Sequence, residues 1–317
     1  MADYQAPSTL NRKFTHSVYR MISLSPLLAK LWLAGIGRVL SGVKNFRIKT
    51  RFVSNMRSYP WPDIRFSSRT VHIFNDLKIK LIPHTDSFDF FTLFNNKLNY
   101  EPEVFALLRK RIATYDVIIE IGANVGVFTM FFANELHRLK RDTPIYAFEP
   151  SNKAYIRLLQ NLELNHSENV HPMNVAVFSK TGFIDFFEPE GCLTNGSVDA
   201  NFAEIFSKNI RKSKVAAISE SELIELAENQ KSVFIKLDVE GAEAAIIKSM
   251  QNFIECKQPE MSIEVLKEYE HELNQLEFLK KMYDYYLMSA DGLLPKTAFE
   301  ANPENRDYLL IPKNKSI

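Results

Sequence analysis

The stretch that decides the fold is Asp116-Val117-Ile118-Ile119-Glu120-Ile121-Gly122-Ala123-Asn124-Val125-Gly126. It begins with a mainly β-branched apolar run, which is typical of a strand buried on both faces of a sheet. Gly122 and Gly126 follow, and residues 127–139 have helical period. Glycine has no Cβ, so the backbone at these two positions can turn sharply and approach a ligand closely. The stretch therefore predicts a strand, a ligand-binding turn and a helix.

Outward from this turn, apolar runs of strand length alternate with segments of helical period. We expect further strands at residues 145–148, 170–177, 233–238 and 261–265, and further helices at 153–164 and 242–252. Such alternation predicts βαβ units and a doubly wound, mainly parallel α/β sheet. Ligands bind these sheets at the carboxyl ends of the strands.

Composition divides the chain into three predicted parts. Residues 1–60 hold ten Lys or Arg and a single acid, and form a basic amphipathic segment. Residues 61–99 form a β-containing lead-in, with a hairpin expected from runs 71–74 and 77–82. Residues 100–317 form the ligand-binding domain. The hydrophobic share of 46% and charged share of 24% exclude a disordered chain and a multi-span membrane protein.

The basic segment predicts an amphipathic helix within residues 18–44. Ser25-Pro26 resembles a helix start, and an apolar stripe recurs every four residues at Leu28, Trp32, Ile36 and Leu40. Lys30 and Arg38 argue against a membrane span, because a basic group at mid-bilayer costs on the order of 2.5–3.5 kcal/mol. Two interpretations stay open: peripheral contact with an anionic membrane, or packing on the catalytic domain or another subunit.

The cysteines and the overall charge bound the setting of the protein. Two cysteines without a CxxC motif exclude a disulfide framework and a structural zinc site, and favour the reduced cytoplasm. On the peripheral interpretation, the protein would lie on the inner face of the membrane. The net charge of +1 says nothing about partners, and we expect no nucleic-acid partner. The oligomeric state is left open.

Two carboxylates beside predicted strand ends indicate the kind of ligand. Glu120 at the turn suits a cationic amine, whereas a pyrophosphate would need bare amides there. The glycine pattern also differs from the dinucleotide motif GxGxxG. Glu149 follows the second strand, where a doubly wound fold places the acid that accepts hydrogen bonds from ribose hydroxyls. Pro150 favours an extended Glu149 that projects from the strand end. The alternatives are a turn without a ligand and a solvated Glu149.

A third acidic group follows the strand at 233–238. Asp238, Glu240 and Glu243 repel one another unless a cation, a proton or hydroxyl donors share the site. We therefore interpret Asp238 and Glu240 as candidates for the reaction centre. Glu264, at the end of the next strand, is a rival for the general base. For Glu243 we favour a structural role at the helix N-terminus. The sequence requires no metal ion.

These blocks, in this order, resemble the FkbM family of methyltransferases over residues 70–312. The matching pieces are Tyr100-Glu101-Pro102-Glu103, IGANVGVFT at 121–129, AFEP at 147–150, NLELN at 161–165, NVAV at 174–177, IKLDVEGAE at 235–243 and YLLIP at 308–312. The resemblance implies a class I Rossmann-like fold, S-adenosylmethionine as cofactor and methyl transfer to oxygen, often on a sugar hydroxyl. It also implies cofactor contacts along the chain. These contacts are Glu120, Gly122, Ala123, Asn124 and Gly126 at the methionine end, Glu149 and Pro150 at the ribose, Asn174 and Ala176 at the adenine, and Asp238.

The acceptor and two other functional classes remain to be considered. Residues 188–214 match no motif, and we expect them to form substrate-facing loops around a small-molecule or glycan acceptor, including a lipid-linked one. A nicotinamide oxidoreductase would share the strand, the glycine turn and the distal acid, but this sequence lacks the middle glycine of the dinucleotide motif and carries Glu120 at the turn. A non-catalytic membrane-surface scaffold would have no use for the three acidic elements.

Overall fold

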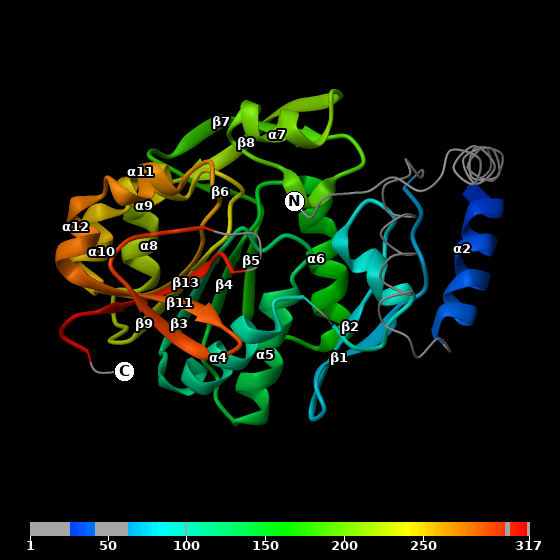
Figure 1. Ribbon diagram of the computed structural model, residues 1–317, viewed down its shortest axis with the longest axis horizontal. Coiled ribbons are helices and arrows are strands. Elements are labelled where there is room, and N and C mark those ends of the chain that lie inside the picture. The colour runs from blue at the N-terminus through cyan, green and yellow to red at the C-terminus, as the bar shows by residue number, and fades with distance from the viewer. Residues whose placement is uncertain (1–25, 42–62, 99, 302–304, 316–317) are drawn as a thin grey trace.

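A central eight-stranded sheet organises the computed structural model, which describes residues 26–41, 63–98, 100–301 and 305–315 (Figure 1). The strand order is β12-β11-β13-β10-β9-β3-β4-β5. Neighbouring strands from β10 to β5 are parallel, and β13, β11 and β12 add antiparallel pairs. The strands are β3 Val117–Ile121, β4 Ile145–Phe148, β5 Val170–Met173, β9 Val233–Leu237, β10 Glu260–Glu264, β11 Tyr283–Ser289, β12 Gly292–Lys296 and β13 Asp307–Pro312. The predicted doubly wound, mainly parallel α/β sheet is confirmed.

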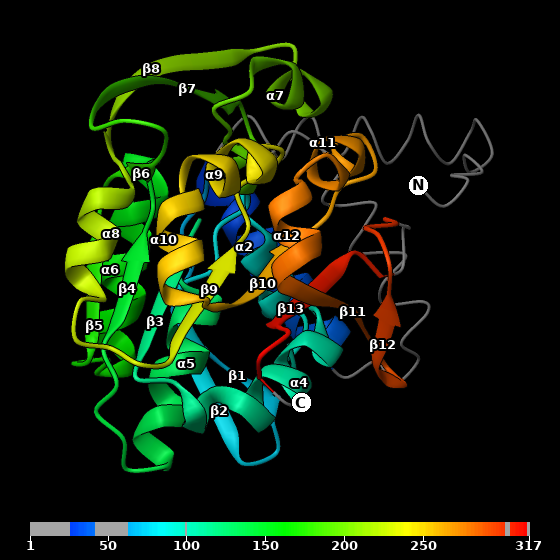
Figure 2. The ribbon, with the colours of Figure 1, turned by 90° about the vertical axis from the view of Figure 1, so that its left-hand side faces the viewer.

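Helices cover both faces of this sheet (Figures 1 and 2). One face carries α4 Pro102–Arg111, α5 Val127–Arg138 and α6 Asn152–Asn165, with the short η2 Ile112–Thr114 after α4. The other carries α8 Glu220–Leu226, α9 Glu243–Ser249, α10 Gln251–Lys257, α11 Glu270–Asn274 and α12 Glu277–Met282. Ile118 joins the core on the first face, while Val117 and Ile119 join the core on the second. Because alternate side chains of β3 enter two cores, its sequence is a continuous apolar run.

Two predicted elements are each divided in the structure. The run 170–177, expected as one strand, is β5 in the central sheet and a separate β6, Ala176–Val177. Between them, the Asn174 side-chain amide donates to the carbonyls of Glu149 and Pro150, which redirects the chain. The helix expected at 242–252 begins at residue 243 and gives way to α10 after Ser249. The Ser249 hydroxyl donates to the Ile246 carbonyl, an interaction that often bends helices.

A small three-stranded sheet lies over the carboxyl ends of the parallel strands (Figure 2). Its order is β6-β8-β7, with β7 at Gly182–Pro189 and β8 at Ile210–Ile218 paired antiparallel along their length. Between β7 and β8 the chain forms η3 Leu193–Asn195 and α7 Ala200–Phe206. The residues 188–214 that match no sequence motif are therefore the end of β7, η3, α7 and the start of β8.

The lead-in before the catalytic domain contains the expected hairpin. Strands β1 Arg69–Phe74 and β2 Leu77–Leu81 pair antiparallel, and β2 packs on α5 and α6. The 3-10 helix η1, Phe88–Leu93, follows. Asn165 at the end of α6 accepts from the Lys80 backbone N–H and donates to the Lys80 carbonyl. The boundaries at residues 60 and 99 stay predictions.

Helix α2, Pro26–Ser41, lies within the predicted 18–44 segment, whose remaining residues are outside the described part. Ala29 and Leu33 are buried in a small core with Phe90 and Leu93 of η1 and with Phe94, which follows it. Trp32 and Ile36 are partly buried beside this core, but Leu28 is 55% exposed. The face of α2 that packs within the described chain is thus centred on Ala29 and Leu33, and Leu28 of the predicted stripe lies outside it. The Leu40 side chain is not described. Among the described helices, none is long and apolar enough to cross a membrane.

Candidate cofactor and catalytic site

The glycine turn after β3 lies against the loop after β9. Gly122 has φ +90°, and a Cβ there would lie 1.8 Å from the backbone oxygen of Asp238. The loop after β3 and the loop after β9 can therefore approach this closely only with glycine at position 122. Gly126 has φ +88° and precedes α5, but a Cβ there would meet Leu158 of α6, at 2.4 Å. Its absent side chain allows α6 to pack, and Gly126 is not among the described residues that line the cavity below.

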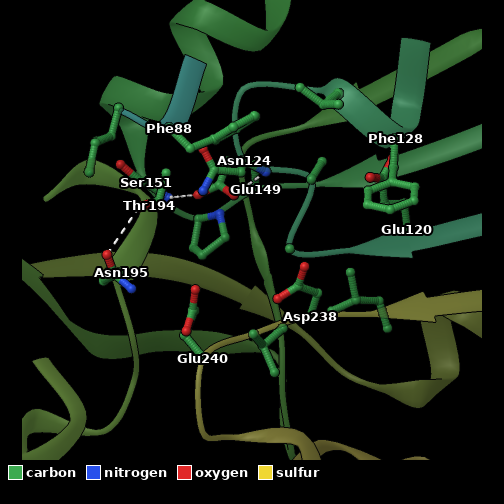
Figure 3. Close-up of a pocket in the computed structure, with 18 of the residues that line it drawn as sticks. Phe88, Glu120, Asn124, Phe128, Glu149, Ser151, Thr194, Asn195, Asp238 and Glu240 are labelled. Atoms are coloured by element: carbon green, nitrogen blue, oxygen red, sulfur yellow. Dashed lines mark hydrogen bonds between the residues drawn. The ribbon is translucent and has the colours of Figure 1, made fainter. Parts of the chain in front are cut away.

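Glu149 lies at the carboxyl end of β4 and is only 6% exposed. Its Oε2 accepts from the Asn124 backbone N–H at 2.8 Å, and its Oε1 accepts from the Ser151 N–H at 2.7 Å (Figure 3). Burial raises the pKa of Glu149 to about 7, although these two hydrogen bonds favour its ionised form. Each carboxylate oxygen retains acceptor capacity for a further donor. Asn174 supports this loop from behind through its two carbonyl contacts and does not line the cavity.

Glu120 lies on β3 and faces α5. It is 2% exposed, and its Oε2 accepts a hydrogen bond from the Thr129 hydroxyl at 2.6 Å. Burial raises its pKa to about 7, against the opposing effect of the Lys236 ammonium. Glu120 lines the cavity together with Gly122, Ala123 and Asn124. The predicted methionine-end residues are therefore adjacent in space, with Gly126 excepted.

Asp238, Glu240 and Glu264 form an acidic cluster in which their carboxylate oxygens approach within 4.8 Å of one another. Burial opposes ionisation of all three, but the ammonium of Lys236 lowers the pKa of Asp238 below its usual range. Burial and the Asp238 charge raise the pKa values of Glu240 and Glu264 well above theirs. Asp238 and Glu240 line the cavity, whereas Glu264 lies behind it, paired with Arg306 at 2.7 Å. Asp238 is thus the ionised acid that faces the cavity.

Glu243, the first residue of α9, has a structural environment. It is 1% exposed and accepts hydrogen bonds from the backbone N–H groups of Val239 and Gly241. These bonds close the loop between β9 and α9, as the structural interpretation predicted.

One cavity of about 850 Å³ joins these loops to two other walls. In Figure 3, Asp238 and Glu240 lie between the side that carries Glu120 and Phe128 and the side that carries Thr194 and Asn195. One further wall comes from η1 and the residues after it, the other from η3 and α7. These walls contribute Phe88, Phe91, Thr92, Asn95, Lys97, Leu193, Thr194, Asn195, Phe202, Ile205 and Phe206. The walls combine aromatic rings with hydroxyl, amide and ammonium groups.

Sequence reasoning missed three parts of this cavity. Lys236 precedes Asp238 in the third motif but was not singled out as functional, although a lysine inside a buried strand is itself an unusual signal. Arg306 lies outside every motif. The η1 wall has no sequence signal that distinguishes it from an ordinary apolar lead-in, because its role depends on where the chain folds back.

Comparison with known proteins identifies the family. The model of the family described as "Methyltransferase FkbM domain" matches residues 120–285, more than half of the chain. The hexuronic acid methyltransferase AglP of Haloferax volcanii is 27% identical over 158 residues, which are 50% of this chain and 59% of AglP. The chain thus matches less than two thirds of that relative's length.

Two solved structures are among those similar to this chain. The FkbM methyltransferase of Methylobacillus flagellatus has a TM-score of 0.38 and 14% identity, covering 61% of this chain and 43% of its own. TYW2 of M. jannaschii, solved in complex with AdoMet, has a TM-score of 0.37 and 13% identity, covering 79% of this chain and 84% of its own.

The doubly wound sheet and its strand-end loops define a class I Rossmann-like methyltransferase. The chain belongs to the FkbM methyltransferase family, and its cofactor is S-adenosylmethionine. The residues around the cavity fit this molecule by their chemistry. Glu149 offers acceptors for ribose hydroxyls, and the apolar Val175, Ala176 and Val177 suit a purine ring. The individual contacts, those of Gly126 and Asn174 included, stay predictions, as does the expectation that no metal is required.

Proposed function

We propose that this enzyme transfers a methyl group to a hydroxyl oxygen of a sugar, and that a hexuronate unit, free or lipid-linked, is the acceptor. The observation that carries the proposal is the continuity of the cavity. Strand-end loops suited to the cofactor and two walls suited to a sugar meet at Asp238. Aromatic faces and side-chain hydroxyls and amides are typical of a site that orients a polar ligand with apolar faces.

Two cations that line the cavity besides Lys236 support an acidic sugar. They are Lys97 and Arg306. An Arg or Lys side chain would hold a carboxylate through charge-assisted hydrogen bonds, leaving the sugar hydroxyls to approach the acidic cluster. The name of the relative AglP, a hexuronic acid methyltransferase, agrees with this acceptor class.

The transfer needs one base and accurate positioning. Bound S-adenosylmethionine supplies a methyl group on a sulfonium, which is already reactive. The acceptor oxygen forms a bond to this methyl carbon while the carbon–sulfur bond breaks, and the hydroxyl proton passes to the Asp238 carboxylate. Holding the two reactants in line supplies most of the acceleration. Among Asp238, Glu240 and Glu264, we assign the base to Asp238, since it is ionised and faces the cavity.

The experiment incubates the enzyme with S-adenosylmethionine and a panel of D-glucuronate, D-galacturonate, D-glucose and their lipid-linked forms. Mass spectrometry should detect one added methyl group on a uronate, stable to mild alkali as a methyl ether is. An alkali-labile product would be a methyl ester and would overturn transfer to a hydroxyl. Methylation of glucose with no preference for a uronate would overturn the role given to Lys97 and Arg306.

We also propose that α2 holds the enzyme at an anionic membrane surface, where a lipid-linked acceptor is presented. Leu27, Leu28 and Leu31 are 55–66% exposed on this helix, beside the exposed Lys30. The first 60 residues carry ten basic groups and one acid. Apolar insertion combined with basic residues supports reversible binding to anionic lipids. The same helix contacts η1, whose Phe88 and Phe91 line the cavity.

A further inference from the structure

Lys236 occupies an unusual position for a lysine. It lies on β9, in register with Glu120 of β3, so both side chains leave the same face of the sheet, toward α5. The residue is 3% exposed and lines the cavity. Its Nζ donates to Asp238 Oδ2 at 2.8 Å and lies 4.3 Å from the centroid of the Phe128 ring. The contacts with one carboxylate and one aromatic face thus fix the orientation of the buried Lys236 ammonium.

The charges around this lysine explain why it stays protonated. Burial opposes its charged form, but the carboxylates of Asp238, Glu101 and Glu120 raise its pKa above the usual value. Glu101 adds a buried Oε2 that has no hydrogen-bond partner among the described residues. The surroundings are therefore rich in carboxyl groups, and a neutral side chain at position 236 would leave Asp238 as an uncompensated buried charge.

We propose that Lys236 is a positioning residue for methyl transfer, which holds Asp238 ionised and in one orientation where the cofactor loops meet the acceptor walls. This inference rests on the proposed function, in which Asp238 takes up the acceptor proton. A carboxylate can take up that proton only if it does not already carry one.

The ionisation of Asp238 depends on groups from every element packed around it. Lys236, a side-chain hydrogen bond with Glu264 and the charge of Arg306 favour its charged form. The acidic and phenolic groups that interact with it are Tyr100 and Glu101 before α4, Glu120 on β3, Glu149 after β4, Glu240 and Glu243 after β9, Glu264 on β10 and Asp307 on β13. Because acids outnumber cations here, removing one ammonium should favour protonation of Asp238.

The test is a pH titration of the full-length protein, labelled with ¹³C at the aspartate carboxyl carbons and observed by NMR. The Asp238 signal is assigned by its loss in Asp238→Asn. In the wild type it should stay at the ionised position down to acidic pH. In Lys236→Met the titration midpoint should move up by about 1–3 pH units, the range over which a neighbouring cation acts on a carboxylate. Lys236→Gln, which keeps a donor without the charge, should shift likewise, and Lys236→Arg should restore the wild-type midpoint.

Two controls separate positioning from folding. Lys78→Met makes the same change on the exposed face of β2 and should leave the Asp238 midpoint unchanged. If Lys236→Met does not fold, Lys236→Gln carries the comparison. An unshifted midpoint in folded Lys236→Met or Lys236→Gln would overturn the inference. The titration uses neither cofactor nor acceptor, so a shifted midpoint together with no methylation of any sugar would reject the proposed function alone.

Discussion

Two clusters of charged side chains in this enzyme use the same residue types for different ends. The ion-pair cluster comprises Asp63, His84, Asp86, Lys153 and Arg157. There Arg157 contacts Asp86 at 2.8 Å and Lys153 contacts Asp63 at 2.8 Å, so two acids face two cations and a histidine. The acidic cluster of Asp238, Glu240 and Glu264 is paired with Lys236 and Arg306 and has an excess of carboxylates. In the ion-pair cluster, the acids of the lead-in pair with Lys153 and Arg157 of α6 and hold the two parts together. The acidic cluster, which has more carboxylates than cations, lies at the cavity.

The pKa of Asp63 in the ion-pair cluster moves in the opposite direction from those of two acids that line the cavity. Burial opposes the ionisation of Asp63, but hydrogen bonds from His84 and Lys153 and the Arg157 charge lower its pKa far below the usual value. Beside the cavity, burial raises the pKa values of Glu120 and Glu149 to about 7. Perturbed carboxyls that cluster around a cavity indicate a functional site, while well-paired ones indicate a structural one. The following predictions test this difference.

The largest effect should follow Asp238→Asn, which removes the base proposed in the acidic cluster. We expect the methyl-transfer rate to fall about 10²–10⁴-fold, the usual contribution of general-base assistance. The measurement is single-turnover kinetics with the uronate acceptor identified by mass spectrometry. Asp142→Asn, an exposed change of the same kind, is the control. A wild-type rate in Asp238→Asn would show that positioning alone suffices and that the acidic cluster is structural too.

Arg157→Met should produce the largest loss of stability in the ion-pair cluster. The Arg157 side chain is 6% exposed, and its loss would leave the equally buried Asp86 with a single cation. Breaking a buried pair from one side costs about 3–5 kcal/mol. Urea denaturation measures this, with the exposed Arg69→Met as control. Affinity for S-adenosylhomocysteine in the folded variant should not change, and a large change there would contradict the separation of the two clusters.

Ionisation of Glu149 should lower the free energy of unfolding of the cofactor-free protein as pH rises. Its folded-state pKa of about 7 exceeds the usual value of 4.5, so the folded state binds the proton more tightly. The associated stability is complete below pH 4.5 and is lost as pH rises through 7, on the order of 3 kcal/mol. Glu149→Gln should reduce this decline in thermal unfolding curves between pH 5 and 8. The exposed Glu163→Gln, on α6, should not.

The same variant should weaken binding of S-adenosylhomocysteine about 10–100-fold, because a hydrogen bond to a charged group contributes about 1.5–3 kcal/mol. Ribose hydroxyls donate, so they favour the ionised form of Glu149. Binding to the wild type at pH 6.5 should therefore release a proton. Calorimetry in two buffers of different ionisation enthalpy measures this release, and equal heats in both buffers would contradict a ribose contact at Glu149.

The smallest effect should come from α2, which lies outside both clusters. Basic groups near an anionic leaflet contribute about 1 kcal/mol each, so binding should be reversible and weakened by salt. We expect co-sedimentation with anionic vesicles, none with neutral vesicles, and reduced binding by a variant with Leu27, Leu28 and Leu31 changed to Ser. Equal sedimentation by that variant would mean that the exposed leucines serve another contact.

The residues on the cofactor side of the cavity could be predicted from sequence because each directly follows, or ends, a predicted strand. A buried apolar run followed by glycines, or by an acid and proline, places Glu120, Gly122 and Glu149 at one edge of a parallel sheet without knowledge of other contacts. Gly126 and Asn174 were assigned to the cofactor by resemblance. The structure places Gly126 against Leu158 and Asn174 behind the Glu149 loop. The cofactor contacts of these two residues stay predictions.

The sequence by itself determined the fold class, the family and the strand-end acids. This was possible because the periodicity of apolar residues and the residue types of turns can be recognised within short segments. Tertiary structure alone decided which of these acids is ionised. Asp238 and Glu264 are separated by 26 residues, and their different pKa directions depend on Lys236 and on burial that only packing creates. It also decided the acceptor walls, because η1 and α7 lie far apart in the chain and meet only over the folded sheet.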